Sequence, residues 1–279
     1  MKVGIIGPAD RALAWEKHLA GHPFVSEIII AANLQKIGPV DACLLLSETD
    51  ANTQQTLAAL KKGLHTFLIS NLPLNLKTAE KLYFASNEAS VRLQFSHWPT
   101  LAPASQWIAN KIPKPSFLQI VREITHSTFL ESNSTHKAFW IDELAYCLKS
   151  INSTVFQISY NCSRLSGKTI ATHILLQFDN GSTASIYINT AAESDSHRRY
   201  ISDINYGIET KVAAQEIRIM RRLNEEPLFF ERKKFDPATA AEQAVVKFLK
   251  AIRLKKVTLY NGYDLLQLNK TIEKIKAKV

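Results

Sequence analysis

Four side chains in two segments have types and spacing that suit catalysis, three of them by proton transfer and one by stacking on a ring. His97 and Trp98 follow an apolar segment, so they are expected at the end of a strand. There His97 could exchange a proton and Trp98 could stack on a ring, or the pair could simply cap the strand before a proline turn. Asp142 and Tyr146 lie four residues apart in a helical pattern, one turn from each other on one face. The catalytic candidates are therefore His97, Asp142 and Tyr146, although ordinary helix packing also explains the last two.

Two further segments carry groups that could reach a ligand. The segment 193–200 reads as a loop after a strand, and its paired Arg198 and Arg199 suit a carboxylate or phosphate. A solvated connecting loop is the plainer interpretation. His126 and His136 flank a Ser/Thr-rich segment that could form a lid, but neither has a partner at metal-ligand spacing, so no metal is expected.

The first third of the chain supplies the elements that must position these groups. Short apolar strands alternate with amphipathic helices, which predicts βαβ units and a doubly wound parallel sheet of the Rossmann type over residues 1–117. The expected strands are 2–7, 26–33, 41–47, 65–70 and 91–97, and the expected helices are 12–21, 52–63, 76–89 and 104–112.

The pattern changes after residue 117. Residues 118–279 begin with a helix at 137–151 and continue with alternating strands, two of which meet at the Asn-Gly turn 179–182. Two helices close the chain, at 239–252 and 263–278. The sequence predicts a C-terminal α+β domain with an open mixed, mostly antiparallel sheet covered by helices on one face.

The turn after the first strand has the context of a dinucleotide-binding loop but only one of its three glycines. The G-x-G-x-x-G positions carry Gly7, Ala9 and Ala12, so a methyl group stands where a pyrophosphate would approach. Asp10 is expected to be the N-cap of the following helix and to compete with phosphate there, while Arg11 would offset its charge.

The acidic residue that would bind a ribose hydroxyl after the second strand is also missing. Asn33 stands in that place, where it could donate to a ribose oxygen or, together with Lys36, tolerate a 2'-phosphate. A plain loop residue is equally compatible with the sequence.

The order of these motifs resembles the Gfo/Idh/MocA family of NAD(P)-dependent oxidoreductases. The resemblance rests on "KVGIIG", "LAALKKGLHTFLISNLPLNLKTAEKL", the "WIDEL" helix, the "LQFDNGSTASIYI" hairpin and the two closing helices, and it covers essentially the whole chain. It implies NAD or NADP as the cofactor, a sugar, polyol or related small molecule as the substrate, and a homo-oligomer formed through the C-terminal sheet.

The resemblance also places the family's functional motifs on this chain. The Glu-Lys-Pro signature falls on Asn71, Leu72 and Pro73, and the lysine that normally binds substrate hydroxyls is lost. The His-x-x-Asp signature keeps Asp142 but has Phe139 in place of the histidine. The predicted cofactor-binding residues are Gly7, Ala9, Asp10, Arg11, Ala12, Asn33, Ser47, Asn71 and Pro73.

Composition limits the classes of protein to which the chain can belong. The net charge of +9 invites a nucleic-acid hypothesis, but the basic residues are scattered and no nucleic-acid motif accompanies them. The longest apolar runs are too short to span a bilayer, and the chain reads as cytoplasmic. Cys43, Cys147 and Cys162 are expected to be buried thiols. Two functions stay open: an oxidoreductase with relocated catalytic groups, or a catalytically inert relative that binds a ligand or regulates a partner.

Overall fold

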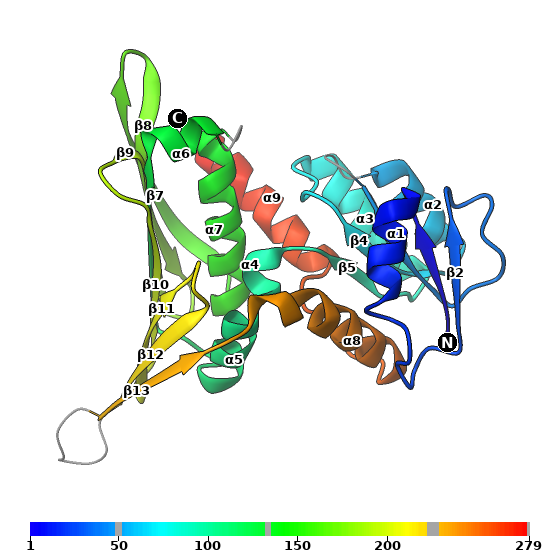
Figure 1. Cartoon of the computed structure of the whole chain (residues 1–279). Coiled ribbons are helices and arrows are strands. Elements are labelled where there is room, and N and C mark those ends of the chain that lie inside the picture. Colours follow the sequence, from blue (N-terminus) through cyan, green and yellow to red (C-terminus); the bar gives the residue numbers. More distant parts are fainter. Residues whose placement is uncertain (48–51, 132–134, 222–228, 278–279) are drawn as a thin grey trace. The chain divides into compact units, whose positions relative to one another are not determined.

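The chain forms two compact units in a computed structural model that describes residues 1–47, 52–131, 135–221 and 229–277 (Figure 1). Unit 1 contains Met1–Leu101 and Ala238–Lys270, and unit 2 contains Ala102–Pro237 and Thr271–Val279. The units are therefore not contiguous in sequence, whereas the sequence pattern predicts a single boundary after residue 117. Within the described part of the chain, no helix is long and apolar enough to cross a membrane.

Unit 1 is built on a parallel sheet with the strand order β2-β1-β3-β4-β5. Each predicted strand is present, with ends that differ by a few residues. The elements are β1 (Lys2–Ile6), α1 (Ala9–Glu16), β2 (Glu27–Ala31), β3 (Ala42–Leu46), α2 (Thr53–Lys61), β4 (His65–Ile69), α3 (Leu76–Glu88), β5 (Leu93–Phe95), α4 (Trp98–Leu101) and α8 (Ala240–Arg253).

The strand order changes direction at β1, which has β2 on one side and β3 on the other. In open α/β sheets such a switch point is where ligands bind, outside the carboxyl ends of the strands. The connection from β2 to β3 is residues 32–41 and contains no helix. Compared with the usual six-stranded order, the sheet therefore lacks one strand and one helix after β2.

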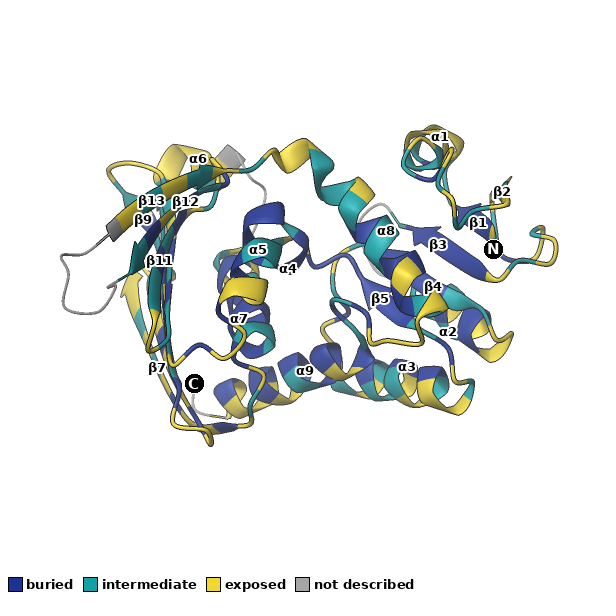
Figure 2. Cartoon of the chain, turned by 90° about the horizontal axis from the view of Figure 1, so that it is seen from below, coloured by how far each residue is buried: buried dark blue, intermediate teal, exposed yellow. Residues whose placement is uncertain are grey.

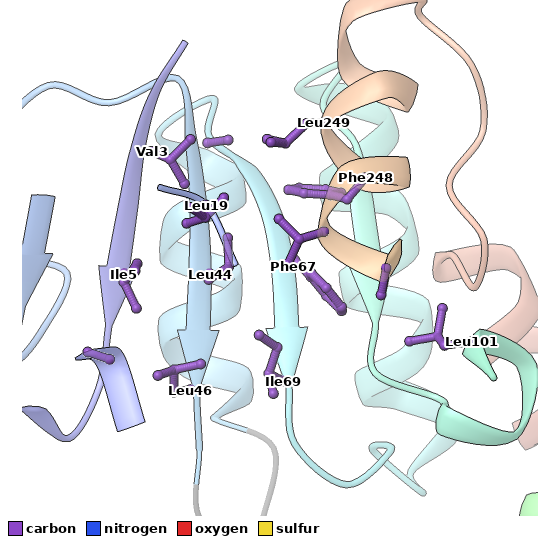
Figure 3. Packing of buried hydrophobic residues seen from close by; sticks show 14 residues of the cluster. Val3, Ile5, Leu19, Leu44, Leu46, Phe67, Ile69, Leu101, Phe248 and Leu249 are labelled. Carbon is purple, nitrogen blue, oxygen red and sulfur yellow. The ribbon is translucent and has the colours of Figure 1, made fainter. Parts of the chain in front are cut away.

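The core of unit 1 combines residues from both ends of the chain. Apolar side chains of β1, β3 and β4 pack against α8, whose Phe248 lies 5.6 Å from Phe67 between ring centroids (Figure 3). Phe67, Phe248 and Leu249 are fully buried. Because α8 covers one face of the sheet, this unit needs the C-terminal segment to complete its core.

Unit 2 is built on an eight-stranded sheet. Its elements are α5 (Pro103–Lys111), β6 (Phe117–Thr125), α6 (His126–Glu131), α7 (His136–Ile151), β7 (Val155–Leu165), β8 (Lys168–Phe178), β9 (Thr183–Ala192), β10 (Ser196–Ser202), β11 (Tyr206–Lys211), β12 (Glu216–Arg221) and β13 (Phe229–Lys234). The chain ends with α9 (Gly262–Lys276), whose residues from Thr271 onward belong to this unit.

The predicted mixed sheet is confirmed. Its order is β13-β12-β11-β10-β6-β9-β8-β7, and the pair β6 and β9 is parallel while the other pairs are antiparallel. The predicted hairpin at 179–182 joins β8 and β9. Helix α7 lies along one face of the sheet and is buried over most of its length (Figure 2).

Two local predictions about unit 2 are corrected by the structure. Residues 196–202 form strand β10 between β6 and β11, so the predicted loop 193–200 is confined to its first residues. The pattern was hidden because its inward positions carry His197 and Arg199 instead of apolar side chains. In the predicted lid, residues 126–131 form α6, and residues 132–134 lie outside the described residues.

The three cysteines are free thiols. Cys43 and Cys147 are buried as predicted, and burial raises the pKa of the Cys43 thiol to about 11. Cys162 is only half-buried. A buried, protonated thiol is expected to have low reactivity, so a structural role is the simplest role for Cys43 and Cys147.

Candidate functional site

The carboxyl edge of the five-stranded sheet brings the predicted cofactor residues into one row. Gly7 follows β1, Asn33 follows β2, Ser47 follows β3, and Asn71 and Pro73 follow β4. These four strands are neighbours in the sheet. The edge therefore has the layout of a dinucleotide-binding crevice.

Helix α1 begins without a side-chain cap, so the prediction that Asp10 is its N-cap is wrong. The N-cap is Pro8, which has no side chain that could accept a hydrogen bond, and Asp10 lies inside the first turn. Asp10 lies two residues after the N-cap, because the helix already begins at Ala9. The amides of this helix end consequently keep their affinity for an anion, which the Asp10 carboxylate opposes by charge alone.

Arg11 connects α1, which follows β1, to the residue after β3 at the switch point of the sheet. Its Nη1 donates a hydrogen bond to the carbonyl oxygen of Ser47, 2.7 Å away, which holds a guanidinium beside the start of α1. Ala12 is fully buried, as the helix-packing position of the glycine loop requires. A positive group and an uncapped helix end thus occur together at the place where phosphate binds in this class of sheet.

Gly7 is the one loop glycine whose replacement the structure forbids. Its φ is +152°, and a Cβ atom there would lie 2.7 Å from the Cβ of Leu46. The close approach of β1 to β3 depends on this residue. The glycine that remains is therefore the one that shapes the turn. Ala9 stands at the fingerprint position that faces a ligand, and Ala12 at the position that packs on the sheet.

Asn33 is used mainly by its own loop. Its Oδ1 accepts hydrogen bonds from the amides of Gln35 and Lys36, both at 3.1 Å. The loop after β2 is thereby fixed by an Asx-type turn. The part of this side chain left for a ribose is its amide nitrogen, a donor where the acidic residue of other Rossmann sheets would accept.

The turn after β4 is held by neighbours on both sides. The amide of Ser70 donates to Oγ of Ser96, which in turn donates to the carbonyl of Ser70. The carbonyl of Pro73 accepts from Nδ2 of Asn269 at 3.0 Å. Pro73 is buried, while Leu72 is half-buried and offers no polar atom in place of the family's lysine.

His97 is packed inside unit 1, and strand β5 ends at Phe95, two residues earlier than predicted. The His97 side chain is 2% exposed, its Nδ1 lies 2.7 Å from Oγ1 of Thr100, and its ring lies 4.7 Å from that of Tyr260. Trp98 is 41% exposed and stacks on Trp15. The structure accounts for His97 by packing, and its assignment as a proton-transfer group rests on the sequence alone.

A buried ion pair joins α7 to β10 in unit 2. Arg199 donates from Nε to Oε2 of Glu143 at 2.9 Å and from Nη2 to Oε1 at 3.0 Å. Both side chains are almost fully buried. Burial alone would raise the pKa of Glu143, but Arg199 and His197 together hold it well below its usual range.

Two more side chains complete this buried cluster. Nε2 of His197 lies 3.0 Å from Oε1 of Glu143, and burial lowers the pKa of the imidazole. The guanidinium of Arg199 lies 3.9 Å from the ring centroid of Tyr146, and burial raises the pKa of that phenol. Tyr146 is thus a support for Arg199, and its predicted role as a proton donor remains a prediction.

Asp142 has the properties of a proton acceptor. Burial, and next the negative charge of Glu143, raise the pKa of Asp142 to about 6, against the opposing effect of Arg122 and Arg199. Arg122 is itself placed by Phe139, whose ring centroid lies 4.3 Å from the guanidinium carbon. A carboxyl group that titrates this close to neutrality is matched to general acid–base work near pH 7.

The raised pKa of Asp142 predicts a pH-dependent stability. The ionised carboxylate is disfavoured in the folded state, so folding loses stability as pH rises from about 4 to about 6. Replacing Asp142 by Asn should therefore leave stability unchanged near pH 4 and raise it at pH 8 by about 2–3 kcal/mol. Urea unfolding of both proteins at several pH values measures this difference.

Asp179→Asn, at the exposed hairpin turn, is the matched control and should show no such trend. A constant difference between Asp142→Asn and the original protein from pH 4 to pH 8 would show that Asp142 titrates normally.

Sequence reasoning missed Glu143 and Arg122. The available signal was a carboxylate at 143 directly before the apolar run 144–148 on a helix, which implies either a buried partner or a break in the apolar face. Within residues 1–47, 52–131, 135–221 and 229–277, no three His, Cys, Asp or Glu side chains are grouped as metal ligands would be.

The chain is similar to known proteins in its fold, at low sequence identity. No family model and no curated protein matches the chain. A structure of the UDP-N-acetylglucosamine 3-dehydrogenase GnnA from Acidithiobacillus ferrooxidans matches 100% of this chain and 97% of its own at 15% identity, with a TM-score of 0.76. An NAD binding oxidoreductase from Klebsiella pneumoniae matches 99% of this chain and 96% of its own at 13% identity, with a TM-score of 0.80.

A third structure, the dehydrogenase MviM from Clostridium difficile, matches 100% of this chain and 99% of its own at 15% identity, with a TM-score of 0.73. The chain has the Gfo/Idh/MocA fold. The fold class predicted from the sequence is confirmed, and the match extends over both units. Because one Gfo/Idh/MocA fold can carry different chemistry, the activity must be argued from the residues at the strand ends and on α7.

Proposed function

We propose that this protein is an NAD(P)-dependent oxidoreductase that acts on a sugar, a polyol or a related small molecule, with Asp142 as its proton acceptor. The observation that carries the proposal is the raised pKa of Asp142, about 6, in a buried cluster. Asp142 occupies the position of the aspartate in the family's His-x-x-Asp motif, where Phe139 has replaced the histidine.

The residues at the edge of the five-stranded sheet fit the pyrophosphate of a dinucleotide. The uncapped start of α1 offers backbone amides, and Arg11 adds a positive charge beside them. Asn33 would offer its amide nitrogen to the ribose oxygens, which differs from the usual carboxylate. A nicotinamide cofactor bound there would supply the hydride acceptor for oxidation of an alcohol.

The chain's own contribution to such a reaction would be proton transfer and positioning. The carboxylate of Asp142 would take the proton of the substrate hydroxyl. Arg122 would hold Asp142 in its charged form, and Glu143 would oppose that, so the two set the pH at which the base becomes available. The buried Glu143 and Arg199 pair would keep α7 in place on β10.

A catalytically inert relative is the second candidate. It is favoured by Leu72 and Phe139, which stand where the family has its lysine and histidine. Phe139 is 8% exposed and packs against Phe129 and Arg122, so it is an integral part of the unit 2 core. An inert protein of this kind would keep a ligand-binding edge without transferring a hydride.

Titration with NADH and NADPH, followed by a substrate screen, distinguishes the two candidates. We expect saturable binding of one of them, followed by nicotinamide fluorescence and by a rise in melting temperature. Asp10→Asn should tighten this binding by about two- to fivefold, because it removes a negative charge from the helix end that receives the phosphates.

Glu16→Gln, in the last turn of the same helix, is the matched control and should leave the affinity unchanged. No binding of either cofactor at millimolar concentration would exclude hydride transfer. Binding without any reduction of ketones or oxidation of alcohols in a substrate screen would support the inert relative.

We also propose that the chain forms a homo-oligomer through the face of the eight-stranded sheet that α7 does not cover. Apolar groups on the sheet remain exposed, among them Leu175 at 38% and Phe230 at 48%. Exposed apolar groups on a sheet face are a common feature of subunit interfaces.

A further inference from the structure

Unit 2 contains a pocket that the proposed reaction does not use. Its volume is about 490 Å³, within the range of sites that hold small molecules. It is formed by the first turns of α7, by β7 and β8, and by the last turn of α9. All of its lining residues belong to unit 2, and none of them is among the residues assigned above to the cofactor or to Asp142.

The walls of the pocket are aromatic and aliphatic. Trp140 comes from α7, Tyr160 from β7 and Ile275 from α9. The rings of Trp140 and Tyr160 meet edge to face, with centroids 6.3 Å apart at an interplanar angle of 66°. Two aromatic rings in the wall give a flat ligand apolar surface of the kind that aromatic groups prefer.

The rim of the pocket is positively charged. Lys137 lies at the start of α7, and Lys276 lies at the end of α9, where Glu273 offsets part of its charge at 2.7 Å. The first turn of α7 contains no acidic residue, so no carboxylate there offsets the positive end of its helix dipole, and the hydroxyl of the N-cap Thr135 accepts from the amide of Ala138. An anionic group is therefore favoured at this rim.

Polar groups that could orient a ligand lie beside the lysines. Thr169 lines the pocket, as does His136, whose Nδ1 is 3.5 Å from Oγ1 of Thr172. Burial lowers the pKa of His136, so the imidazole is neutral at pH 7 and the positive charge comes from the lysines.

We propose that this pocket binds a small aromatic carboxylate, with its ring system against Trp140 and Tyr160 and its carboxylate toward Lys137. Trp140 and Phe139 are adjacent in sequence but point to different neighbours, Tyr160 and Arg122 respectively. Arg122 is also a charged neighbour of Asp142, which follows Phe139 by three residues on the helix. The pocket thus lies on a different side of α7 from Asp142, and the ligand is separate from the substrate of the proposed reaction.

Fluorine NMR on the full-length protein tests the proposal. The probes are 6-fluoro-2-naphthoate and the uncharged 6-fluoro-2-naphthamide, which have the same ring system. We expect the carboxylate to bind at least about tenfold more tightly than the amide, because the rim supplies a charge-assisted contact that the amide cannot make. Addition of NADH should not displace it, because the lining residues all belong to unit 2.

Variants of single lysines assign the binding to this pocket. Lys137→Glu should weaken binding of the carboxylate by about tenfold or more and leave the amide unaffected. Lys274→Gln, two positions from Lys276 on the same helix but outside the lining, is the matched control and should bind as the original protein does. Trp140→Phe should weaken both probes, since it removes ring area that each would contact.

Three results would overturn the proposal. The first is the absence of binding of both probes, and the second is equal affinity for carboxylate and amide. The third is carboxylate binding that Lys137→Glu leaves unchanged or that NADH displaces, which would place the probe at another site. None of these experiments measures turnover. A negative result would therefore contradict the aromatic-carboxylate pocket without contradicting the proposed oxidoreductase activity, and a lack of cofactor binding would not contradict the pocket.

Discussion

Replacing Glu143 by Gln is expected to lower the stability of unit 2 by about 3–5 kcal/mol, because it leaves the buried guanidinium of Arg199 without a counter-charge. Both hydrogen bonds of the pair join α7 to β10, and water cannot take the place of the lost carboxylate at a site this buried. Urea unfolding measures the loss. A Trp15→Phe/Trp98→Phe background limits the fluorescence signal to Trp107 and Trp140, which both belong to unit 2.

Two controls separate charge from packing in this experiment. Glu123→Gln removes a carboxylate that is one-third exposed and 4.0 Å from Arg198, and it should cost less than about 1 kcal/mol. The double variant Glu143→Leu/Arg199→Met removes both buried charges and should recover most of the lost stability. A loss below about 1 kcal/mol for Glu143→Gln would show that Arg199 finds another partner.

Replacing Asp142 by Asn is expected to lower kcat by about 10²- to 10⁴-fold, the usual contribution of a general base. Affinity for the cofactor should not change, because the predicted cofactor residues lie in unit 1 and Asp142 lies in unit 2. The base must be ionised to accept a proton, so the rate of alcohol oxidation should rise as pH increases through about 6. Asp142→Asn should lose this rising limb.

The measurement is a pH profile of kcat for the substrate found in the screen. Asp179→Asn serves again as the control and should keep both the rate and the profile. An unchanged kcat in Asp142→Asn would assign proton transfer to a different group. The stability gain expected for Asp142→Asn at pH 8 tests the same assignment independently of the rate. A purely structural carboxylate would stabilise the fold when it ionises, so its replacement would lower the stability at pH 8.

The sequence was sufficient to predict the fold because its signals are local and redundant. Apolar strands followed by amphipathic helices fix the parallel sheet of unit 1, and the Asn-Gly turn fixes the hairpin of β8 and β9. Strand β10 was misread as a loop because its inward positions, His197 and Arg199, are charged or polar. Only the partner carboxylate on α7, far away in sequence, makes such a strand stable.

The candidate site was less predictable for the same reason. Asp142 can be singled out from the sequence because it falls within a recognisable motif, but its raised pKa depends on burial and on Glu143, Arg122 and Arg199, which no local pattern brings together. Asp10 was misplaced as an N-cap because the cap position depends on where the first helical residue falls, and α1 begins at Ala9, two residues earlier than an Asp10 cap would require.

The non-contiguous core of unit 1 has a consequence for how the protein is made. Phe67 and its neighbours on the sheet are covered by Phe248 and Leu249, which leave the ribosome some 180 residues later in the chain. At a synthesis rate of roughly 5–20 residues per second, this apolar surface stays uncovered for about ten seconds or more, while unit 2 emerges between the two halves. The nascent protein must therefore pass through a stage in which its N-terminal sheet depends on chaperones or on transient contacts for protection from aggregation.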